Sequence, residues 1–439
     1  MPDRRRAVVV GGGYAGLVTA RVLADRFDEV TVIERDSVAQ SPNPAHRKGT
    51  PQSRHPHALL ARGARILQEL FPGLREELSE AGAPLSDFGC FPMLYPTGWS
   101  PSVRTALALQ TFSRPLLEAA LCRRVMARPT VTVLDETQVE GLVLDQRHRC
   151  VTGVRISGHT VRSADLVVIA TGRHGRAPTW LTDVGLPEPD ILGVDGKLSY
   201  TSRVYRRDPV ARPDLRASVQ ATLAPTARRG GAVTAIEGDR WLVCLFGADG
   251  EAAPTDPEGF GAYADSLANP HVRHVVRECE PLGELYRYGG LGGRWHRYDR
   301  LRPWPGGLVV LGDALCSLNP LYGHGMTVAA LQAQLLARAL DAGGHDRRGL
   351  DRACAAFQRR SPRTLLLPWY LSTSLDLGWR TGDVPLAADL ARRYLHHLLR
   401  RIPDDPELYR RFLNVQHMVA TPLTLLAPPV RLRRRGARP

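Results

Sequence analysis

The chain has 439 residues, of which 43% are hydrophobic, and a formal net charge of +14. This length can bury a large core and exceeds the usual size of one domain, so we expect two closely packed domains and exclude a short peptide-like module. Lys48 and Lys197 are the only lysines, and the arginines are spread along the whole chain without a zinc-finger spacing or an RNA-binding signature. The positive charge therefore does not indicate a nucleic-acid partner.

The seven cysteines lie far apart and never form a CxxC pair. This pattern argues against a disulfide framework and against a zinc site, and it is typical of reduced thiols in a cytoplasm. The basic N-terminus "MPDRRRAVVVGGG" is followed by an apolar run too short for a secretory signal, and no apolar segment reaches the roughly 18 residues that span a bilayer. We therefore expect a soluble cytoplasmic protein that holds no metal.

The first elements in chain order are a strand, a helix and a second strand. Residues 7–10 are a short β-branched run, residues 17–23 have the apolar spacing of a helix, and residues 30–33 are a second β-branched run. Together they predict a βαβ unit at the start of a parallel sheet.

The turn of this unit carries the glycine pattern GxGxxG. Gly11, Gly13 and Gly16 allow the tight turn, the close approach of the backbone to a pyrophosphate and the packing of the helix on the strand. Glu34 follows the second strand, where a carboxylate can accept hydrogen bonds from an adenosine ribose. The pattern predicts a dinucleotide site at the N-terminus of a helix, and by itself it does not separate NAD from FAD.

The second cofactor signal is a buried strand predicted over residues 166–170, in "DLVVIATGR". Thr171 and Gly172 follow it directly. In an open α/β sheet the ligand lies at the carboxyl ends of the strands, so these two residues are expected beside the dinucleotide.

The third signal is "GGLVVLGDALCSLNPLYGHGMTVAAL". Residues 308–311 predict a buried strand, Gly312 permits a tight turn, and Asp313 then lies where its carboxylate can accept hydrogen bonds from sugar-alcohol hydroxyls. A loop shaped by Pro320, Gly323 and Gly325 precedes a helix predicted over residues 326–336. The N-terminus of that helix would direct its dipole at a neighbouring ring and stabilise a reduced, anionic flavin.

Between these cofactor segments, residues 193–291 alternate between apolar and polar positions and are interrupted by glycine and proline. This pattern predicts an antiparallel sheet inserted as a substrate domain. After Arg352 the spacing is helical, with a break at Pro403. The end of the chain joins an apolar patch to Arg431, Arg433, Arg434 and Arg435; we favour a lid over the pocket followed by a frayed tail, and the alternative is weak contact with a membrane surface.

The predicted fold is therefore α/β: a Rossmann-like dinucleotide-binding domain with an inserted antiparallel β-sheet substrate domain and a C-terminal helical region. The three motifs resemble those of flavoproteins, and this resemblance implies an FAD-binding domain of the glutathione-reductase type. The expected boundaries are residues 1–80, 111–190 and 296–350 for the FAD-binding parts, 81–110 and 191–295 for the substrate domain, and 351–439 for the helical region.

The three motifs in this order resemble the FAD-dependent monooxygenases of the para-hydroxybenzoate hydroxylase superfamily. The segments "PQSRHPHALLARGARILQELFPG" and "NPLYGHGMTVAAL" are most similar to bacterial squalene-epoxidase-like enzymes and to the polyene epoxidases of polyether pathways. The resemblance implies that Glu34 binds the adenosine ribose and that Asp313 binds the ribityl chain. It implies that the isoalloxazine ring is bordered by Pro320, Gly323, Gly325, Met326 and Thr327, of which Pro320, Gly323 and Gly325 are the candidates nearest the reaction. The remaining cofactor-binding candidates are Tyr14, Ala15, Arg35, Arg54, Arg62, Arg114, Val139, Thr171, Gly172 and Gly312. We identify no catalytic side chain.

Two further sets of side chains are candidates for contact with ligands. In the superfamily the inserted sheet roofs the flavin, so we expect substrate contacts from Tyr200, Arg203, Tyr205, Trp241 and Phe246. His55 and His57 flank a proline, but no convergent partner cluster accompanies them, and we favour loop packing or FAD contact over metal binding.

The resemblance implies an enzyme that inserts one oxygen atom of O2, through a flavin C4a-hydroperoxide, into a hydrophobic secondary metabolite. Epoxidation of a polyene, prenyl or terpenoid alkene mainly needs an apolar cavity and positioning, whereas aromatic hydroxylation benefits from a base. The sequence shows no buried acid/base pair near its flavin motifs, and this favours epoxidation. The alternatives are hydroxylation of an aromatic polyketide and a flavin-dependent reductase or dehydrogenase of isoprenoids. The chain lacks a WxWxIP segment, which argues against halogenation, and a non-enzymatic FAD-binding module is the least favoured reading. NAD(P)H would reduce the flavin directly or through a partner reductase, because no second GxGxxG is present.

Overall fold

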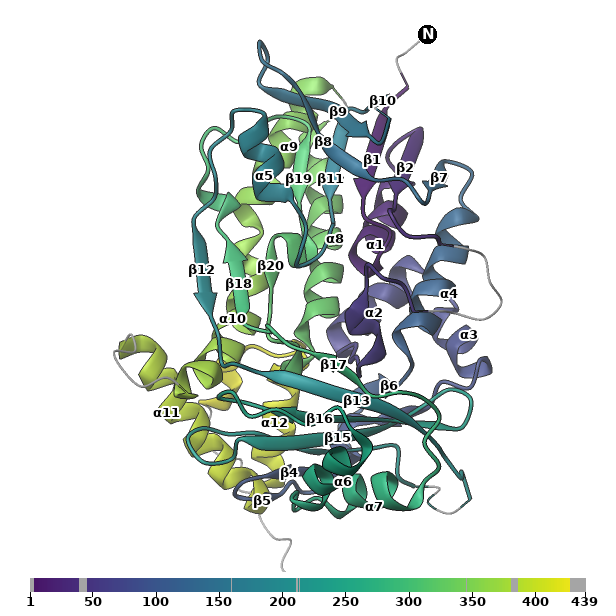
Figure 1. Cartoon of the computed structure of the whole chain (residues 1–439). Helices are drawn as coiled ribbons and strands as arrows, with labels where there is room; N and C mark the ends of the chain where they lie inside the picture. The colour runs from purple at the N-terminus through teal and green to yellow at the C-terminus, as the bar shows by residue number, and fades with distance from the viewer. Residues whose placement is uncertain are drawn as a thin grey trace, which may run out of the picture.

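The computed structural model describes residues 4–38, 46–158, 160–210, 212, 214–344, 346–379 and 386–426. Figure 1 shows two sheets stacked along the long axis of the molecule, a parallel one in the upper half and a larger, mostly antiparallel one in the lower half. Helix α8 (His324–Gly343) runs from the junction of the two halves into the upper one. The region between the sheets is thus bordered by segments from distant parts of the chain.

The upper sheet has five strands, all parallel where they pair. Val9 pairs with Val168 on one side and with Val32 on the other. Its central strands are β-branched runs that are buried on both faces, as parallel sheets require. In spatial order the strands are β19 (Leu308–Val310), β11 (Leu166–Ile169), β1 (Arg6–Val10), β2 (Glu29–Ile33) and β7 (Val131–Leu134).

Helices cover one face of this sheet and an antiparallel sheet covers the other. The helices are α1 (Tyr14–Leu23), α2 (Ala61–Leu70), α3 (Leu74–Glu80), α4 (Arg114–Met126), α8 and α9 (Arg347–Arg360). On the opposite face lie β8 (Val139–Asp145), β9 (Cys150–Ile156), β10 (Thr160–Ser163) and α5 (Ala177–Asp183). Each face has its own hydrophobic core.

The lower sheet has seven strands, antiparallel except for one parallel pair between β14 and β4. In spatial order they are β17 (Tyr286–Tyr288), β13 (Ser199–Arg206), β16 (Arg240–Gly247), β15 (Arg229–Ile236), β14 (Ala217–Gln220), β4 (Met93–Tyr95) and β5 (Gly98–Trp99). One face packs on two helices, α6 (Pro257–Asp265) and α7 (Pro270–Glu278). We call this the outer face, and the face toward the parallel sheet the inner face.

The two helices on the outer face were not anticipated by the sequence analysis, which expected only strands in this region. Asp256 and Asn269 cap them, each accepting a hydrogen bond from a backbone N–H of the first turn, and each cap is followed by a proline at the first helical position. Cap and proline together are a strong helix start signal. The strands around them otherwise follow the predicted alternation.

The remaining elements connect the two halves and form the C-terminal region. The short strands are β3 (Leu85–Asp87), β6 (Ala108–Gln110), β12 (Ile191–Val194), β18 (Gly293–His296) and β20 (Cys316–Ser317), and the C-terminal helices are α10 (Pro362–Asp376), α11 (Leu386–Arg401) and α12 (Pro406–Gln416). The helical spacing is interrupted around Pro403 as predicted. The predicted α/β fold class, with an added antiparallel sheet and a helical C-terminal region, is confirmed.

Two predictions concern the surroundings of the protein rather than its fold. Among the described helices, none is long and apolar enough to cross a membrane. The basic tail with Arg431 to Arg435 lies outside the described residues, so its role as a lid end or membrane contact stays a prediction.

Candidate functional site

The glycine turn after β1 is packed so tightly that side chains cannot enter it. Gly11 has φ +109°, and a Cβ there would lie 2.5 Å from the carbonyl oxygen of Ala170 at the end of the neighbouring strand. A Cβ on Gly16 would lie 1.8 Å from the carbonyl oxygen of Gly11. The N-terminus of α1 is thereby held against the carboxyl edge of the parallel sheet, where its free N–H groups can bind an anion.

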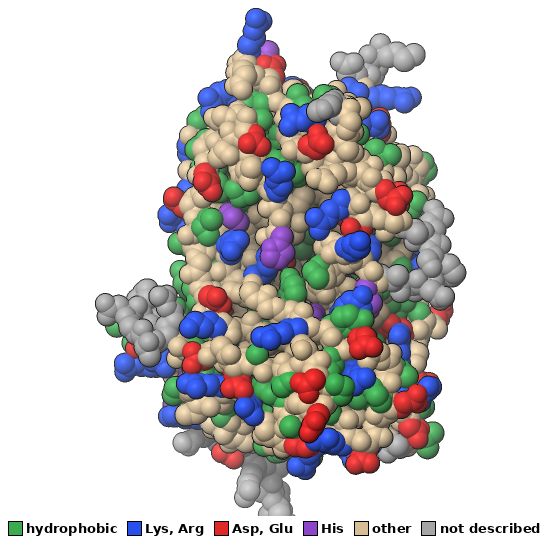
Figure 2. All heavy atoms as spheres, in the orientation of Figure 1, with side chains coloured by type: hydrophobic (Ala, Val, Ile, Leu, Met, Phe, Trp, Pro, Cys, Tyr) green, Lys and Arg blue, Asp and Glu red, His purple; other side chains and the backbone are tan. Residues whose placement is uncertain are grey.

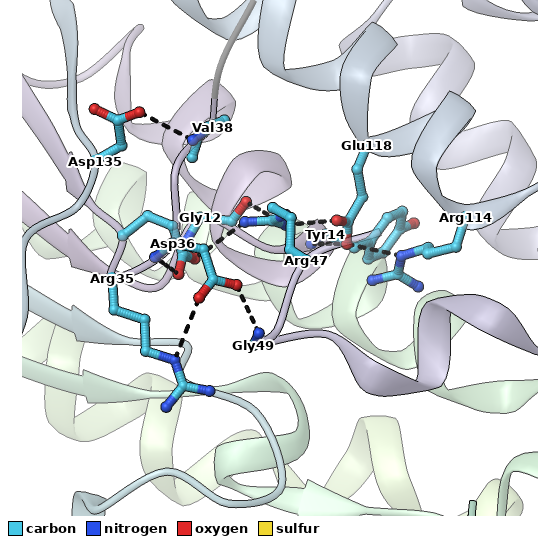
Figure 3. A network of polar contacts seen from close by, with 11 residues as sticks. Gly12, Tyr14, Arg35, Asp36, Val38, Arg47, Gly49, Arg114, Glu118 and Asp135 are labelled. Carbon is cyan, nitrogen blue, oxygen red and sulfur yellow. Dashed lines mark hydrogen bonds and ion pairs between the residues drawn. The ribbon is translucent and has the colours of Figure 1, made fainter. Parts of the chain in front are cut away.

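Glu34, at the end of β2, is buried beside this turn. Its Oε2 accepts a hydrogen bond from the backbone N–H of Gly12 at 2.7 Å, and its Oε1 accepts one from that of Asp36 at 3.1 Å. The neighbouring Arg35 points away from the turn, with its Nε 3.9 Å from Asp36 (Figure 3). The structure thus fixes the Glu34 carboxylate next to the glycine turn and leaves Arg35 mostly exposed.

A buried ion-pair network lies at the N-terminus of α1 (Figure 3). Glu118 of α4 accepts hydrogen bonds from Arg47 at 2.5 Å, from Arg114 at 2.8 Å and from the backbone N–H of Tyr14 at 3.2 Å. Burial alone would raise the pKa of Glu118, but the two guanidinium groups outweigh it and hold the pKa below its usual value. The carboxylate therefore stays ionised at neutral pH.

The network pairs two arginines with two carboxylates and leaves one donor without an acceptor. Arg47 and Arg114 both bind Glu118, Arg47 also lies beside Glu34, and the N-terminus of α1 adds a partial positive charge. Nη1 of Arg47 is buried, 3.5 Å from Glu34, and has no hydrogen-bond partner among the described residues. A phosphate anion at this position would supply the missing acceptor, so the donor set fits the pyrophosphate of a dinucleotide.

Asp313 lies at the carboxyl end of β19, on the other side of the same edge. Gly312 has φ +64°, and a Cβ there would meet the side chain of Ala15 at 2.9 Å, so the turn packs directly on α1. The side chain of Asp313 is exposed to the space between the sheets, yet the surrounding protein desolvates it enough to raise its pKa. A Cβ on Gly325 would lie 4.0 Å from Oδ1 of Asp313, which places the first turn of α8 beside this carboxylate.

The loop before α8 contains Pro320 and Gly323 as predicted, but Gly325 lies in the first turn of the helix, which starts at His324 and not at residue 326. Gly323, which precedes the helix, has φ +71° and would place a Cβ 3.0 Å from that of Ala58. Pro320 begins a short 3-10 turn. Met326 and Thr327 are buried, and a Cβ on Gly63 would lie 2.7 Å from Oγ1 of Thr327, so α2 packs closely on this part of α8.

Thr171 and Gly172 follow the end of β11, as predicted. The next residue, Arg173, makes several hydrogen bonds. Arg173 donates hydrogen bonds to the carbonyl oxygens of Gly290, Gly292 and Leu318, at 3.2, 2.7 and 3.1 Å. It thereby ties the parallel sheet to the strands that lead into the lower half. Val139 is buried at the start of β8.

Two other predicted arginines contact residues from later parts of the chain. Arg54 stacks on the ring of Tyr286 at 3.8 Å, at the edge of the lower sheet. Arg62 lies in the first turn of α2, where its backbone N–H donates to the carbonyl of His417 at 3.3 Å. Arg114, by contrast, packs over the ring of Tyr14 at 5.2 Å and belongs to the network at α1.

The five substrate candidates divide between the two faces of the seven-stranded sheet. Tyr200 and Phe246 are on the inner face, in one hydrophobic cluster. Tyr205 and Trp241 are on the outer face, in the core with α6 and α7, and Arg203 stacks on Tyr205 and donates to the carbonyl of Gly283. Side chains alternate along a strand, so only the first two can face a ligand held between the sheets.

His55 and His57 are neutral packing groups in this structure. Nδ1 of His55 lies 2.8 Å from Oγ of Ser202, and its ring stacks on Tyr288 with a centroid distance of 5.7 Å. Burial lowers the pKa of His55 to about 4 and that of His57 to about 3. Within the described ranges, no group of three or more metal-ligating side chains comes together.

A narrow recess with a volume of about 10 Å³ opens beside the loop that precedes α8. Its apolar lining includes Leu198, Ala248, Leu321, Tyr322 and Trp379, and its polar lining includes Asn319 and Asp376. Asp376 ends α10 and is buried; its Oδ1 accepts a hydrogen bond from Nδ2 of Asn319 at 2.8 Å. The recess joins the inner face of the lower sheet to the loop before α8.

Sequence reasoning missed five polar residues of this region: Arg47, Glu118, Arg173, Asn319 and Asp376. Only Glu118 could have been predicted: it lies four residues after Arg114, and side chains at this spacing lie side by side on a helix. Arg47 and Arg173 carry no distinguishing pattern in a chain that is rich in arginine. Asp376 lies 57 residues from its partner Asn319, and no local pattern announces that pairing.

The comparisons with known proteins agree with this geometry. Residues 6–42 match the model of the pyridine nucleotide-disulphide oxidoreductase family. PqsL, a probable FAD-dependent monooxygenase from Pseudomonas aeruginosa, superposes with a TM-score of 0.65 and 18% identity over 86% of this chain and 98% of its own. The flavin-dependent brominase Bmp2 superposes with a TM-score of 0.65 and 14% identity over 94% of this chain and 92% of its own.

The fold is therefore the one found in these flavin-dependent proteins, and the glycine turn at Gly11, Gly13 and Gly16 is present in it. A curated relative is Protein Rv3254 of Mycobacterium tuberculosis (strain ATCC 25618 / H37Rv), 34% identical over 393 residues that span 85% of this chain and 80% of the relative. The chain belongs to the same protein family as Protein Rv3254. The closer resemblance to bacterial squalene-epoxidase-like enzymes and to the polyene epoxidases of polyether pathways stays a prediction.

Proposed function

We propose that this protein binds FAD and inserts one oxygen atom of O2 into a hydrophobic small molecule. One observation carries the proposal: the carboxyl edge of the parallel sheet brings together the glycine turn, Asp313 and the N-terminus of α8, opposite the inner face of the second sheet. Figure 2 shows basic and histidine side chains across the middle of one face of the molecule, over the region between the two sheets. Such a face suits an anionic dinucleotide.

Each part of the cofactor has a matching group on the chain. Glu34 would bind the adenosine ribose, and Arg47 with Arg114 would hold the phosphates at the N-terminus of α1. Asp313 would accept hydrogen bonds from the ribityl hydroxyls. The isoalloxazine ring would lie against the loop from Pro320 to Gly325, where the dipole of α8 stabilises negative charge.

When bound and reduced, FAD supplies the activation of O2, and the chain supplies position and exclusion of water. The inner face of the lower sheet offers Tyr200 and Phe246 as an apolar wall. Epoxidation of an alkene requires mainly an apolar surface that positions the double bond. The proposed substrate is therefore a polyene, prenyl or terpenoid molecule. NAD(P)H would reduce the flavin, directly or through a separate reductase. The alternative, a flavin-dependent reductase or dehydrogenase of isoprenoids, needs the same wall and no O2.

A second reaction, hydroxylation of a ring that carries a hydroxyl group, is favoured by a specific observation. Asp376 is a buried carboxyl group on the wall of the recess beside the loop before α8. The sequence favours epoxidation because it shows no buried acid or base near the flavin motifs. Asp376 is such a group, so this argument against hydroxylation no longer holds.

Flavin binding tests the site. We expect the purified protein to retain FAD, identified by mass after release, and Asp313→Ala to weaken FAD binding by roughly 10- to 100-fold, because hydrogen bonds to a charged acceptor are lost. Asp183→Ala, at an exposed position on α5, is the control and should bind as the wild type does. An Asp313→Ala protein with unchanged FAD affinity would contradict the assigned role.

A further inference from the structure

The end of α12 lies against the N-termini of two helices from earlier parts of the chain. His417, which directly follows α12, is fully buried. Its Nδ1 accepts a hydrogen bond from the backbone N–H of Ala61, the first residue of α2, at 3.2 Å, and its carbonyl oxygen accepts one from the N–H of Arg62 at 3.3 Å. The carbonyl oxygen of Gln416 accepts a hydrogen bond from Nε2 of His324, the first residue of α8, at 3.2 Å. One turn of the C-terminal region thus contacts the start of both helices.

These contacts supply caps that α2 and α8 do not have in their own sequence. The N-cap residues are Leu60 for α2 and Gly323 for α8, and neither side chain accepts a hydrogen bond from the first turn. The first N–H groups of a helix have no partner within the helix, and burying them unpaired costs free energy. His417 caps α2 from 356 residues away, at Ala61. The cap is therefore a tertiary contact.

The end of α12 leaves its last two carbonyl groups available for this contact. The carbonyl oxygen of Asn414 accepts hydrogen bonds from the N–H groups of Val419 and Ala420, at 3.0 and 3.1 Å, so the chain satisfies it locally. The carbonyl groups of Gln416 and His417 instead bind α8 and α2. The negative end of one helix dipole thereby meets the positive ends of two others, which is a favourable arrangement.

His417 is held in the neutral form that a hydrogen-bond acceptor requires. Burial lowers its pKa to about 3; the nearby His324 lowers it further, while the charge of Asp87 opposes the change. Burial also lowers the pKa of His324 to about 4. The ring of His417 packs edge-on against Phe88, with the centroids 4.5 Å apart, and this contact fixes its orientation. Nδ1 of His417 is therefore an acceptor throughout the neutral pH range.

The segment that His417 caps packs directly on the loop assigned to the flavin. Before the cap, a Cβ on Gly323 would lie 3.0 Å from the Cβ of Ala58. After the cap, a Cβ on Gly63 would lie 2.7 Å from Oγ1 of Thr327, in the first turn of α8. Closely packed groups transmit a displacement to their neighbours. A shift at the start of α2 would therefore move the first turn of α8.

We propose that His417 is a positioning residue for the flavin: by capping α2 it holds the first turn of α8 in place beside the ring, and the C-terminal region thereby sets the reduction potential of the bound cofactor. The proposal rests on the proposed binding of FAD. The dipole of α8 favours negative charge at its N-terminus, so a displaced turn weakens the binding of reduced FAD more than that of oxidised FAD. His417 itself contacts no reacting atom.

The test compares three substitutions of His417 in the FAD-loaded protein. Asparagine carries an acceptor oxygen on Cγ, the atom that carries Nδ1 in histidine, whereas glutamine carries it one bond further out and leucine has none. In His417→Leu and His417→Gln we expect the affinity for reduced FAD to fall about tenfold more than that for oxidised FAD, which lowers the two-electron midpoint potential by ~30 mV. In His417→Asn the ratio of the two affinities should stay within about twofold of the wild type, because the cap is retained.

A matched control separates positioning from general destabilisation. Leu408 is buried in the first turn of α12, at the opposite end of the helix from His417. Leu408→Ala should lower the stability of the fold and leave the midpoint potential unchanged. A second readout needs no cofactor: hydrogen exchange of the Ala61 amide should become roughly tenfold faster in His417→Leu and stay slow in His417→Asn, because only the former loses the acceptor.

The outcomes distinguish this role from the proposed function. A lower potential in His417→Leu and His417→Gln, restored in His417→Asn, supports the role of His417. If His417→Leu is too unstable to hold FAD, the glutamine and asparagine variants give the same comparison with two polar side chains. An unchanged potential in the variants without a cap, or an equal fall in Leu408→Ala, overturns the role and leaves the binding of FAD standing. A loaded wild type that never transfers oxygen contradicts the monooxygenase function and leaves the role of His417 intact.

Discussion

The two ends of the space between the sheets differ in how their charges are satisfied. At the N-terminus of α1, Glu34, Arg47, Arg114 and Glu118 form a dense network that is nearly complete without a ligand (Figure 3). At the recess, Asp376 has one partner and one open oxygen in an apolar lining. On the proposed function, the first end would hold a polyanion and the second would lie beside the ligand. The difference teaches that the network at α1 is satisfied mostly by the chain itself, whereas Asp376 keeps one open acceptor.

The largest effect is expected from filling the glycine turn. In Gly16→Ala the new Cβ would lie 1.8 Å from the carbonyl oxygen of Gly11, so the turn must open and the phosphate donors move apart. We expect FAD affinity to fall on the order of 100-fold, equivalent to ~3 kcal/mol. Flavin absorbance retained after gel filtration measures this. Gly283→Ala, where a Cβ would meet no atom within 4 Å, is the control. Wild-type affinity in Gly16→Ala would show that the backbone does not approach the cofactor closely.

The ion-pair network should be important for stability as well as for binding. Glu118→Gln removes the carboxylate that both buried arginines bind, and we expect a loss of about 3 kcal/mol in the free energy of unfolding at neutral pH. Thermal or denaturant unfolding measures it, and Glu80→Gln, on an exposed face of α3, should cost far less.

The same variant has a predicted pH dependence. The pKa of Glu118 is lowered in the folded state, so its contribution is fully present above the usual value of 4.5 and is lost as the pH falls through the lower folded value. The difference in stability between wild type and Glu118→Gln should therefore be constant above about pH 5 and shrink below 4.5. A difference that grows on acidification would mean that Glu118 is not held ionised by its arginines.

The smallest expected effect comes from substitutions that compare the inner and outer faces of the lower sheet. Phe246→Leu, on the inner face, should weaken binding of the aromatic probe 2-naphthol by about fivefold, because apolar contact area is lost. Trp241→Leu, on the outer face, should lower stability and leave 2-naphthol binding unchanged. Equal effects of the two variants on binding would mean that the inner face does not line the ligand site.

Local patterns predicted the strands and the glycine turn of the parallel sheet and could not predict the polar pairs that tertiary packing forms. The β-branched runs and the glycine spacing around Gly11 and Gly16 are contiguous in sequence, and they form the strands and turn expected of them. The pairing of Arg47 with Glu118 spans 71 residues and that of Asn319 with Asp376 spans 57, so each depends on tertiary packing. The alternation of apolar and polar residues in β13 predicted a sheet, but it does not indicate which face of the sheet lies toward the parallel sheet.

Oxygen transfer is the central claim, and labelled oxygen tests it most directly. The FAD-loaded protein is reduced under anaerobic conditions, mixed with oxygen-18 gas and 2-naphthol in a single turnover, and the product mass is measured. We predict that one labelled atom enters the product while the other leaves as water. Complete conversion of the gas to hydrogen peroxide, with no label in 2-naphthol or in a panel of polyene and prenyl alkenes, would contradict the account and favour a reductase or dehydrogenase.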